Sequence, residues 1–106
     1  MKENYKTTDI IIYRGDVFEY YFKINHVAPQ YIKKVMFLSD KGKLYVELPY
    51  YEKQGGYCLR LGSDITKNFE PVIASYDLTV EYVNEQKETL ISDGLFAILK
   101  NRNGNY

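Results

Sequence analysis

The chain of 106 residues contains no tryptophan, one cysteine and one histidine. A lone cysteine, Cys58, excludes an intramolecular disulfide, and a chain of this length can form a sufficient core without one. We interpret Cys58 as a small buried hydrophobe. Metal sites and nucleophile–base pairs need several His, Cys or carboxylate side chains, and His26 has no such partners nearby in the sequence. We therefore expect a protein that is not an enzyme and that holds no metal and no cofactor.

Net charge and long apolar runs are also absent. Fourteen basic and fourteen acidic residues cancel and are interspersed, whereas a nucleic-acid-binding protein normally shows a basic excess or stripe. The first apolar run, residues 10–12, is far shorter than a signal-peptide core or the ~20 residues of a membrane span. We expect a soluble protein made in a cytoplasm, with neither nucleic acid nor membrane as a partner.

The chain does contain many segments in which apolar and polar residues alternate, most clearly over residues 8–24 and 76–98. A period of two is typical of half-buried β-strands. The predicted strands cover residues 7–13, 17–24, 31–39, 44–48, 57–61, 76–83 and 87–100, and a helical turn covers 63–69. About seven short strands separated by turn residues predict an all-β fold, an immunoglobulin-like two-sheet antiparallel sandwich with one short helical turn. Residues 7–100 form the single domain, between flexible segments at 1–6 and 101–106.

Three glycines mark predicted turns. Arg14-Gly15-Asp16 spells an integrin-binding tripeptide, but we interpret it as a structural turn that Gly15 permits and Asp16 caps. Gly42 is predicted to supply the positive φ of a hairpin between the third and fourth strands. Gly94 follows Asp93 inside the last strand and predicts a bulge there.

Twelve tyrosines are the remaining candidates for function. Exposed tyrosine is a good contact residue, because it offers a large area for little loss of rotamer entropy. We nominate Tyr21, Tyr45, Tyr50 and Tyr51 as a protein-contact patch. The alternative is that many of these rings cover the rim of the core.

Motifs at both ends resemble small immunoglobulin-like structural proteins of tailed bacteriophages and prophages. These motifs are Arg14-Gly15-Asp16 with Phe18, Tyr76-Asp77-Leu78, Asp93-Gly94-Leu95-Phe96, and the helical turn over residues 63–69. The resemblance implies a virion component of the tail, baseplate, neck or head, assembled in the bacterial host cytoplasm. Its partners would be other virion proteins, and it would form a homo-oligomer or a ring-like assembly.

Two other functions remain open. One is a small phage-encoded inhibitor that binds a host protein, although such proteins are often acidic and this chain is neutral. The other is a carbohydrate-binding module of the cell surface. Its tyrosines could stack on sugars, but tryptophan is absent.

Overall fold

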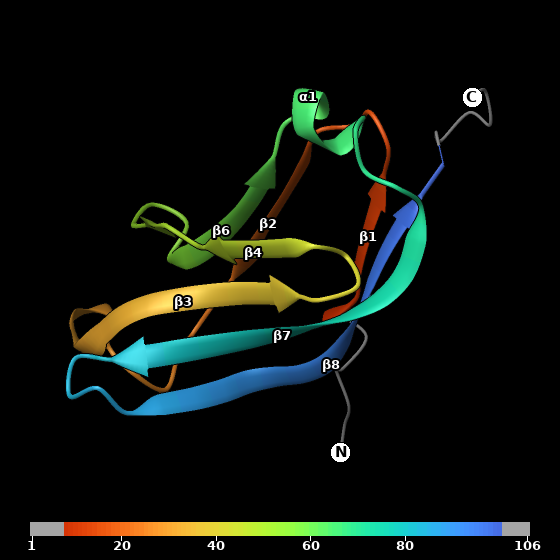
Figure 1. The fold of residues 1–106 in the computed structure, drawn as a ribbon. Coiled ribbons are helices and arrows are strands. Elements are labelled where there is room, and N and C mark those ends of the chain that lie inside the picture. The colour runs from red at the N-terminus through yellow and green to blue at the C-terminus, as the bar shows by residue number, and fades with distance from the viewer. Residues whose placement is uncertain (1–7, 101–106) are drawn as a thin grey trace, which may run out of the picture.

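Two β-sheets pack face to face in the computed structural model, which describes residues 8–100. The predicted flexible segments 1–6 and 101–106 lie outside the described residues. In the order in which the strands pair, the larger sheet contains β1 (Ile10–Tyr13), β8 (Lys87–Leu99), β7 (Val72–Tyr82), β3 (Ile32–Ser39) and β4 (Leu44–Glu47). The smaller sheet contains β2 (Phe18–Phe22), β6 (Gly56–Leu61) and β5 (Tyr50–Tyr51). The described residues also contain the short helical turns η2 (Pro29–Tyr31) and α1 (Ser63–Thr66) (Figure 1).

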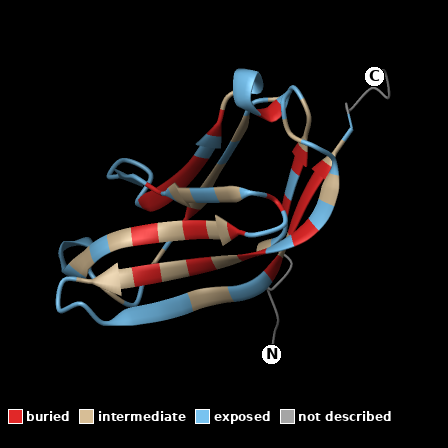
Figure 2. Cartoon of the chain, viewed as in Figure 1, coloured by how far each residue is buried: buried red, intermediate tan, exposed pale blue. Residues whose placement is uncertain are grey.

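The core lies between the two sheets and follows the alternation in the sequence. Along β3 and β7 every second residue is buried, so each strand turns one face to the core (Figure 2). Phe22 from the smaller sheet contacts Phe37 and Tyr76 from the larger, with ring centroids 6.4 and 6.3 Å apart. The stacked rings of Phe37 and Tyr76 lie 4.6 Å apart. The prediction of an all-β two-sheet sandwich is therefore confirmed.

The strand order is that of an immunoglobulin-like sandwich. In immunoglobulin lettering, the strands from β2 to β8 correspond in chain order to B, C, C′, D, E, F and G. After β1, the larger sheet then has the order G-F-C-C′, and the smaller sheet has the order B-E-D. One pairing departs from the antiparallel pattern of the other strands, because β1 pairs with β8 in parallel. The turn after β1 is not a hairpin but carries the chain into the other sheet, so β1 remains free to lie beside the last strand.

A bulge interrupts the long β7–β8 pair. Tyr76 pairs with Gly94, but Leu78 pairs with Ile91, so β8 has one extra residue in this interval. Asp93, within the bulge, adopts a φ of 57°. Gly94 lies directly against the Tyr76 ring, where an added Cβ would be 2.6 Å from a ring carbon. The Tyr76 hydroxyl donates a hydrogen bond to the carbonyl of Thr8, and burial raises the pKa of this phenol.

Two details of the predicted third strand and its hairpin differ from the structure. Lys43, with a φ of 55°, takes the left-handed position that we predicted for Gly42. Gly42 is buried against Phe96, whose ring carbon would lie 2.4 Å from an added Cβ. An unbroken apolar run, here residues 35–38, is typical of a strand covered on both faces, yet Met36 and Leu38 are only half-buried on the outer face of the sheet.

Candidate functional site

The Arg14-Gly15-Asp16 turn is bonded to helix α1. Gly15 has a φ of +87°, and the Asp16 amide donates to the Tyr13 carbonyl at 3.1 Å, as in a turn with a left-handed third residue. The buried Thr66 hydroxyl accepts from the Gly15 amide at 3.1 Å and donates to the Asp16 carbonyl at 2.7 Å. Arg14 donates from Nη2 to the Lys67 carbonyl at 3.0 Å. These bonds join the turn to the helix that closes the same end of the sandwich.

Two of the nominated tyrosines meet on the outer face of the smaller sheet. Tyr21 on β2 and Tyr51 on β5 approach edge to face, with ring centroids 5.9 Å apart and an interplanar angle of 82°. Cys58 lies between them on β6, directly opposite Tyr21. It is only 1% exposed although it points away from the core, because the tyrosines cover it. Burial raises the pKa of the Cys58 thiol and disfavours the reactive thiolate.

An ion pair borders the two rings. Arg60 Nη1 lies 2.7 Å from Glu19 Oε2 across the β2–β6 pair, on the same outer face. Burial, followed by the Glu19 charge, raises the pKa of the Tyr21 phenol. We call the surface formed by Glu19, Tyr21, Tyr51, Cys58 and Arg60 the tyrosine face. It combines aromatic area with both signs of charge.

The other two nominated tyrosines lie elsewhere. Tyr50 precedes Tyr51 on β5 and therefore points to the opposite face, where its ring is 5.0 Å from that of Tyr57. Tyr45 is on β4 of the larger sheet, is 59% exposed and donates to Asp40 at 2.6 Å. The four nominated residues therefore do not form one patch, and only Tyr21 and Tyr51 lie together.

A groove opens between β2 and β8, where the two sheets separate. Its volume is about 410 Å³. Most of its lining is apolar and aromatic, namely Tyr20, Tyr21, Phe22, Ile24, Leu78, Leu90 and Ile91, and Thr8, Lys23 and His26 complete it. The groove continues the core to the surface and presents few polar groups that could orient a substrate.

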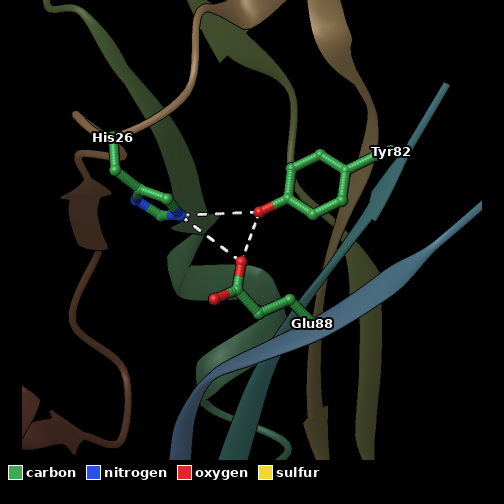
Figure 3. A network of polar contacts seen from close by, with 3 residues as sticks. All are labelled: His26, Tyr82 and Glu88. Atoms are coloured by element: carbon green, nitrogen blue, oxygen red, sulfur yellow. Dashed lines mark hydrogen bonds and ion pairs between the residues drawn. The ribbon is translucent and has the colours of Figure 1, made fainter. Parts of the chain in front are cut away.

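His26, which lines this groove, also belongs to a polar cluster with Tyr82 and Glu88 (Figure 3). His26 Nε2 is 3.4 Å from Glu88 Oε1 and 3.5 Å from the Tyr82 hydroxyl, which donates to the same Glu88 oxygen. The hydrogen bond from Tyr82, followed by that from His26, lowers the pKa of Glu88. His26 and Glu88 are about half exposed, so the cluster is accessible to water. It links the β2–β3 loop to the β7–β8 pair.

The sequence shows no partner near His26 and did not indicate this cluster, since the two partners are 56 and 62 residues away. The cluster contains no serine, cysteine or lysine nucleophile that the imidazole could activate.

Over residues 8–100 no group of three or more His, Cys, Asp or Glu side chains is arranged to hold a metal ion. In the same part of the chain, no helix has the length and apolar character that crossing a membrane requires.

Comparison with family models, with curated proteins and with solved structures gives no match for this chain.

Proposed function

We propose that this chain is a non-enzymatic assembly module, an immunoglobulin-like structural or accessory protein of a bacteriophage or prophage virion. Its partners are other virion proteins, arranged with rotational symmetry around a head, neck, tail or baseplate axis. The tyrosine face is the observation that carries the proposal. The fold brings Tyr21 and Tyr51 together from two strands at the two edges of the smaller sheet.

This face has the composition of a protein-contact surface. Tyrosine is enriched in interfaces, where its ring supplies contact area and its hydroxyl can bond to a partner. The Glu19–Arg60 ion pair beside the rings is exposed, and charged groups at the rim of an interface favour the correct partner and orientation. The edge strands β2 and β5 also offer backbone groups to a partner strand.

Quantitative mass spectrometry of purified particles tests this proposal. We expect a fixed copy number per particle, in keeping with five-, six- or twelvefold symmetry. Presence in the infected cell but absence from particles would overturn the virion role and favour the inhibitor of a host protein.

A pair of variants tests the tyrosine face itself. Tyr51→Ala should lower the copy number in particles, because it removes one of the two rings. Tyr31→Ala is the matched control, since Tyr31 is 54% exposed but lies in η2, away from this face. Equal incorporation of the two variants would show that the face makes no contact in the particle.

A further inference from the structure

Three side chains that can bind a metal ion converge from three separate segments (Figure 3). His26 is in the loop between β2 and β3, Tyr82 ends β7, and Glu88 lies near the start of β8. An imidazole nitrogen, a phenol oxygen and a carboxylate oxygen point toward one another. Imidazole and carboxylate are standard zinc ligands, and a phenol that loses its proton adds a third, anionic donor.

The distances between these atoms fit a tetrahedral zinc site. Zinc bonds of about 2.0–2.2 Å place the ligand atoms of a tetrahedron roughly 3.3–3.6 Å apart. His26 Nε2 is 3.4 Å from Glu88 Oε1 and 3.5 Å from the Tyr82 hydroxyl. The separation of the Tyr82 and Glu88 oxygens is shorter, because the phenol proton lies between them. Two of the three separations therefore already have the required length.

The backbone around the cluster is held independently of the three side chains. The Tyr82 amide donates to the Gln86 carbonyl at 2.8 Å within the β7–β8 turn. The Val83 amide donates to the Tyr31 carbonyl at 2.9 Å, which joins this turn to the far end of the loop that carries His26. The side chains can therefore exchange their mutual contacts for a metal ion while the backbone keeps its place.

We propose that His26, Tyr82 and Glu88 bind one Zn²⁺ ion in a tetrahedral site whose fourth position holds water. On binding, a Zn–O bond to Tyr82 forms and the phenol O–H bond breaks. The proton passes to solvent, and a Zn–O bond replaces the hydrogen bond that Glu88 accepted from Tyr82. Phenolate and carboxylate together balance the two positive charges of the ion.

The ion would be structural, since it links the β2–β3 loop to the larger sheet and the cluster holds no nucleophile. His26 and Glu88 are about half exposed, so the ion can enter from solvent. Residues 8–100 hold no metal-binding group of three His, Cys, Asp or Glu side chains, and here the phenol supplies the third donor. The site does not depend on the proposed virion role.

Calorimetric titration of the full chain with zinc chloride, after treatment with EDTA, tests the site. We expect one Zn²⁺ per chain with a dissociation constant below about 100 μM, and a higher melting temperature because the ion binds the folded chain. Mg²⁺ should bind far more weakly, since it prefers six oxygen ligands. Absence of saturable zinc binding, or equal affinity for Mg²⁺, would overturn the site.

Two matched substitutions locate the ion. Glu88→Gln should raise the dissociation constant at least about tenfold, because it removes an anionic ligand. Glu85→Gln is the control, since Glu85 is exposed in the adjacent β7–β8 turn and its loss changes the charge equally. Equal binding by the two variants would show attraction by surface charge alone and would overturn the site. Zinc binding that His26→Ala leaves unchanged would also overturn it.

A spectroscopic signature tests the role of Tyr82. Zinc should produce the difference absorption of one ionised tyrosine in the wild type, and Tyr82→Phe should lack this signal. If the wild type binds zinc without a phenolate signal, the phenol is not a ligand and the three-donor site is overturned.

Discussion

The hydroxyl of Thr66 accepts a hydrogen bond from the amide of Gly15 at 3.1 Å, and this contact joins the first turn of the chain to helix α1. The same hydroxyl donates to the carbonyl of Asp16 at 2.7 Å. A side chain with no exposed surface thereby pairs two backbone groups of the turn. The turn and the helix should consequently unfold as one unit.

Thr66→Val should lower the free energy of unfolding by about 1–3 kcal/mol, because it leaves the Gly15 amide and the Asp16 carbonyl without this partner. Urea denaturation measures the effect. Thr79→Val on β7 is the control, because Thr79 is only half-buried on the outer face of the sheet. An equal loss in both variants would mean that the hydroxyl of Thr66 adds nothing specific.

Gly15→Ala should lower the free energy of unfolding by about 1–2 kcal/mol, because a φ of +87° is costly for a residue with a Cβ. Gly15→Asn is the matched comparison and should lose less stability, since nothing lies within 4 Å of a Cβ at this position and asparagine tolerates a positive φ better than alanine. Thermal melting of both variants checks the prediction, and an unchanged melting temperature for Gly15→Ala would contradict it.

Gly94→Ala should destabilise the fold by about 1–3 kcal/mol, because the new methyl group would displace the Tyr76 ring in a filled core. Ser92→Ala, in the exposed part of the same bulge, should change stability much less. Urea denaturation again measures both. If the two alanines are tolerated equally, the ring must be able to move aside.

The Cys58 thiol should react slowly with iodoacetamide in the native protein, because burial raises its pKa and the two tyrosines cover it. Tyr51→Ala should accelerate the reaction, as followed by mass spectrometry well below the unfolding temperature. Tyr50→Ala is the control, because the Tyr50 ring points to the other face of β5. Equal acceleration by both variants would indicate general loosening of β5 instead of loss of cover.

Stability should depend on pH through Glu88. Its pKa is lowered from the ordinary value of 4.5, so the carboxylate stabilises the fold above that value, and the contribution is lost as pH falls through the lowered pKa. Tyr82→Phe removes the largest cause of the shift and should reduce stability at pH 7 more than in acid. Denaturation at several pH values measures this difference, with Tyr31→Phe as control. If Tyr82→Phe lowers the free energy of unfolding by the same amount at every pH, the result would argue against the hydrogen bond to Glu88.

The strands could be predicted because apolar and polar residues alternate along them with a period of two. Phe22 and Tyr76 fall on the core face, as the alternation required, and the bulge beside Gly94 coincides with the break in the pattern. The parallel pairing of β1 with β8 could not be predicted in this way. Alternation tells which face of a strand is buried, but it does not tell which strand is its neighbour.

The candidate surfaces show the same limit. The prediction of one contact patch rests on residue type and expected exposure alone, and only the pairing of β2 and β5 with β6 brings the rings of Tyr21 and Tyr51 together. Tyr50 and Tyr45 satisfied the same compositional criterion and lie elsewhere. The partners of His26 are distant in the sequence, so no local pattern could have indicated them.

The parallel ladder of β1 and β8 has a mechanical consequence. Ile10 pairs with Phe96 and Tyr13 pairs with Leu99, so the start of β1 and the end of β8 lie at opposite ends of this ladder. Tension applied between these two ends acts along the strands and loads the backbone bonds of the ladder in shear. They must break together, whereas in a hairpin pulled from its open end they break one after another. A chain held from both sides in a larger assembly would thus resist extension at this pair of strands.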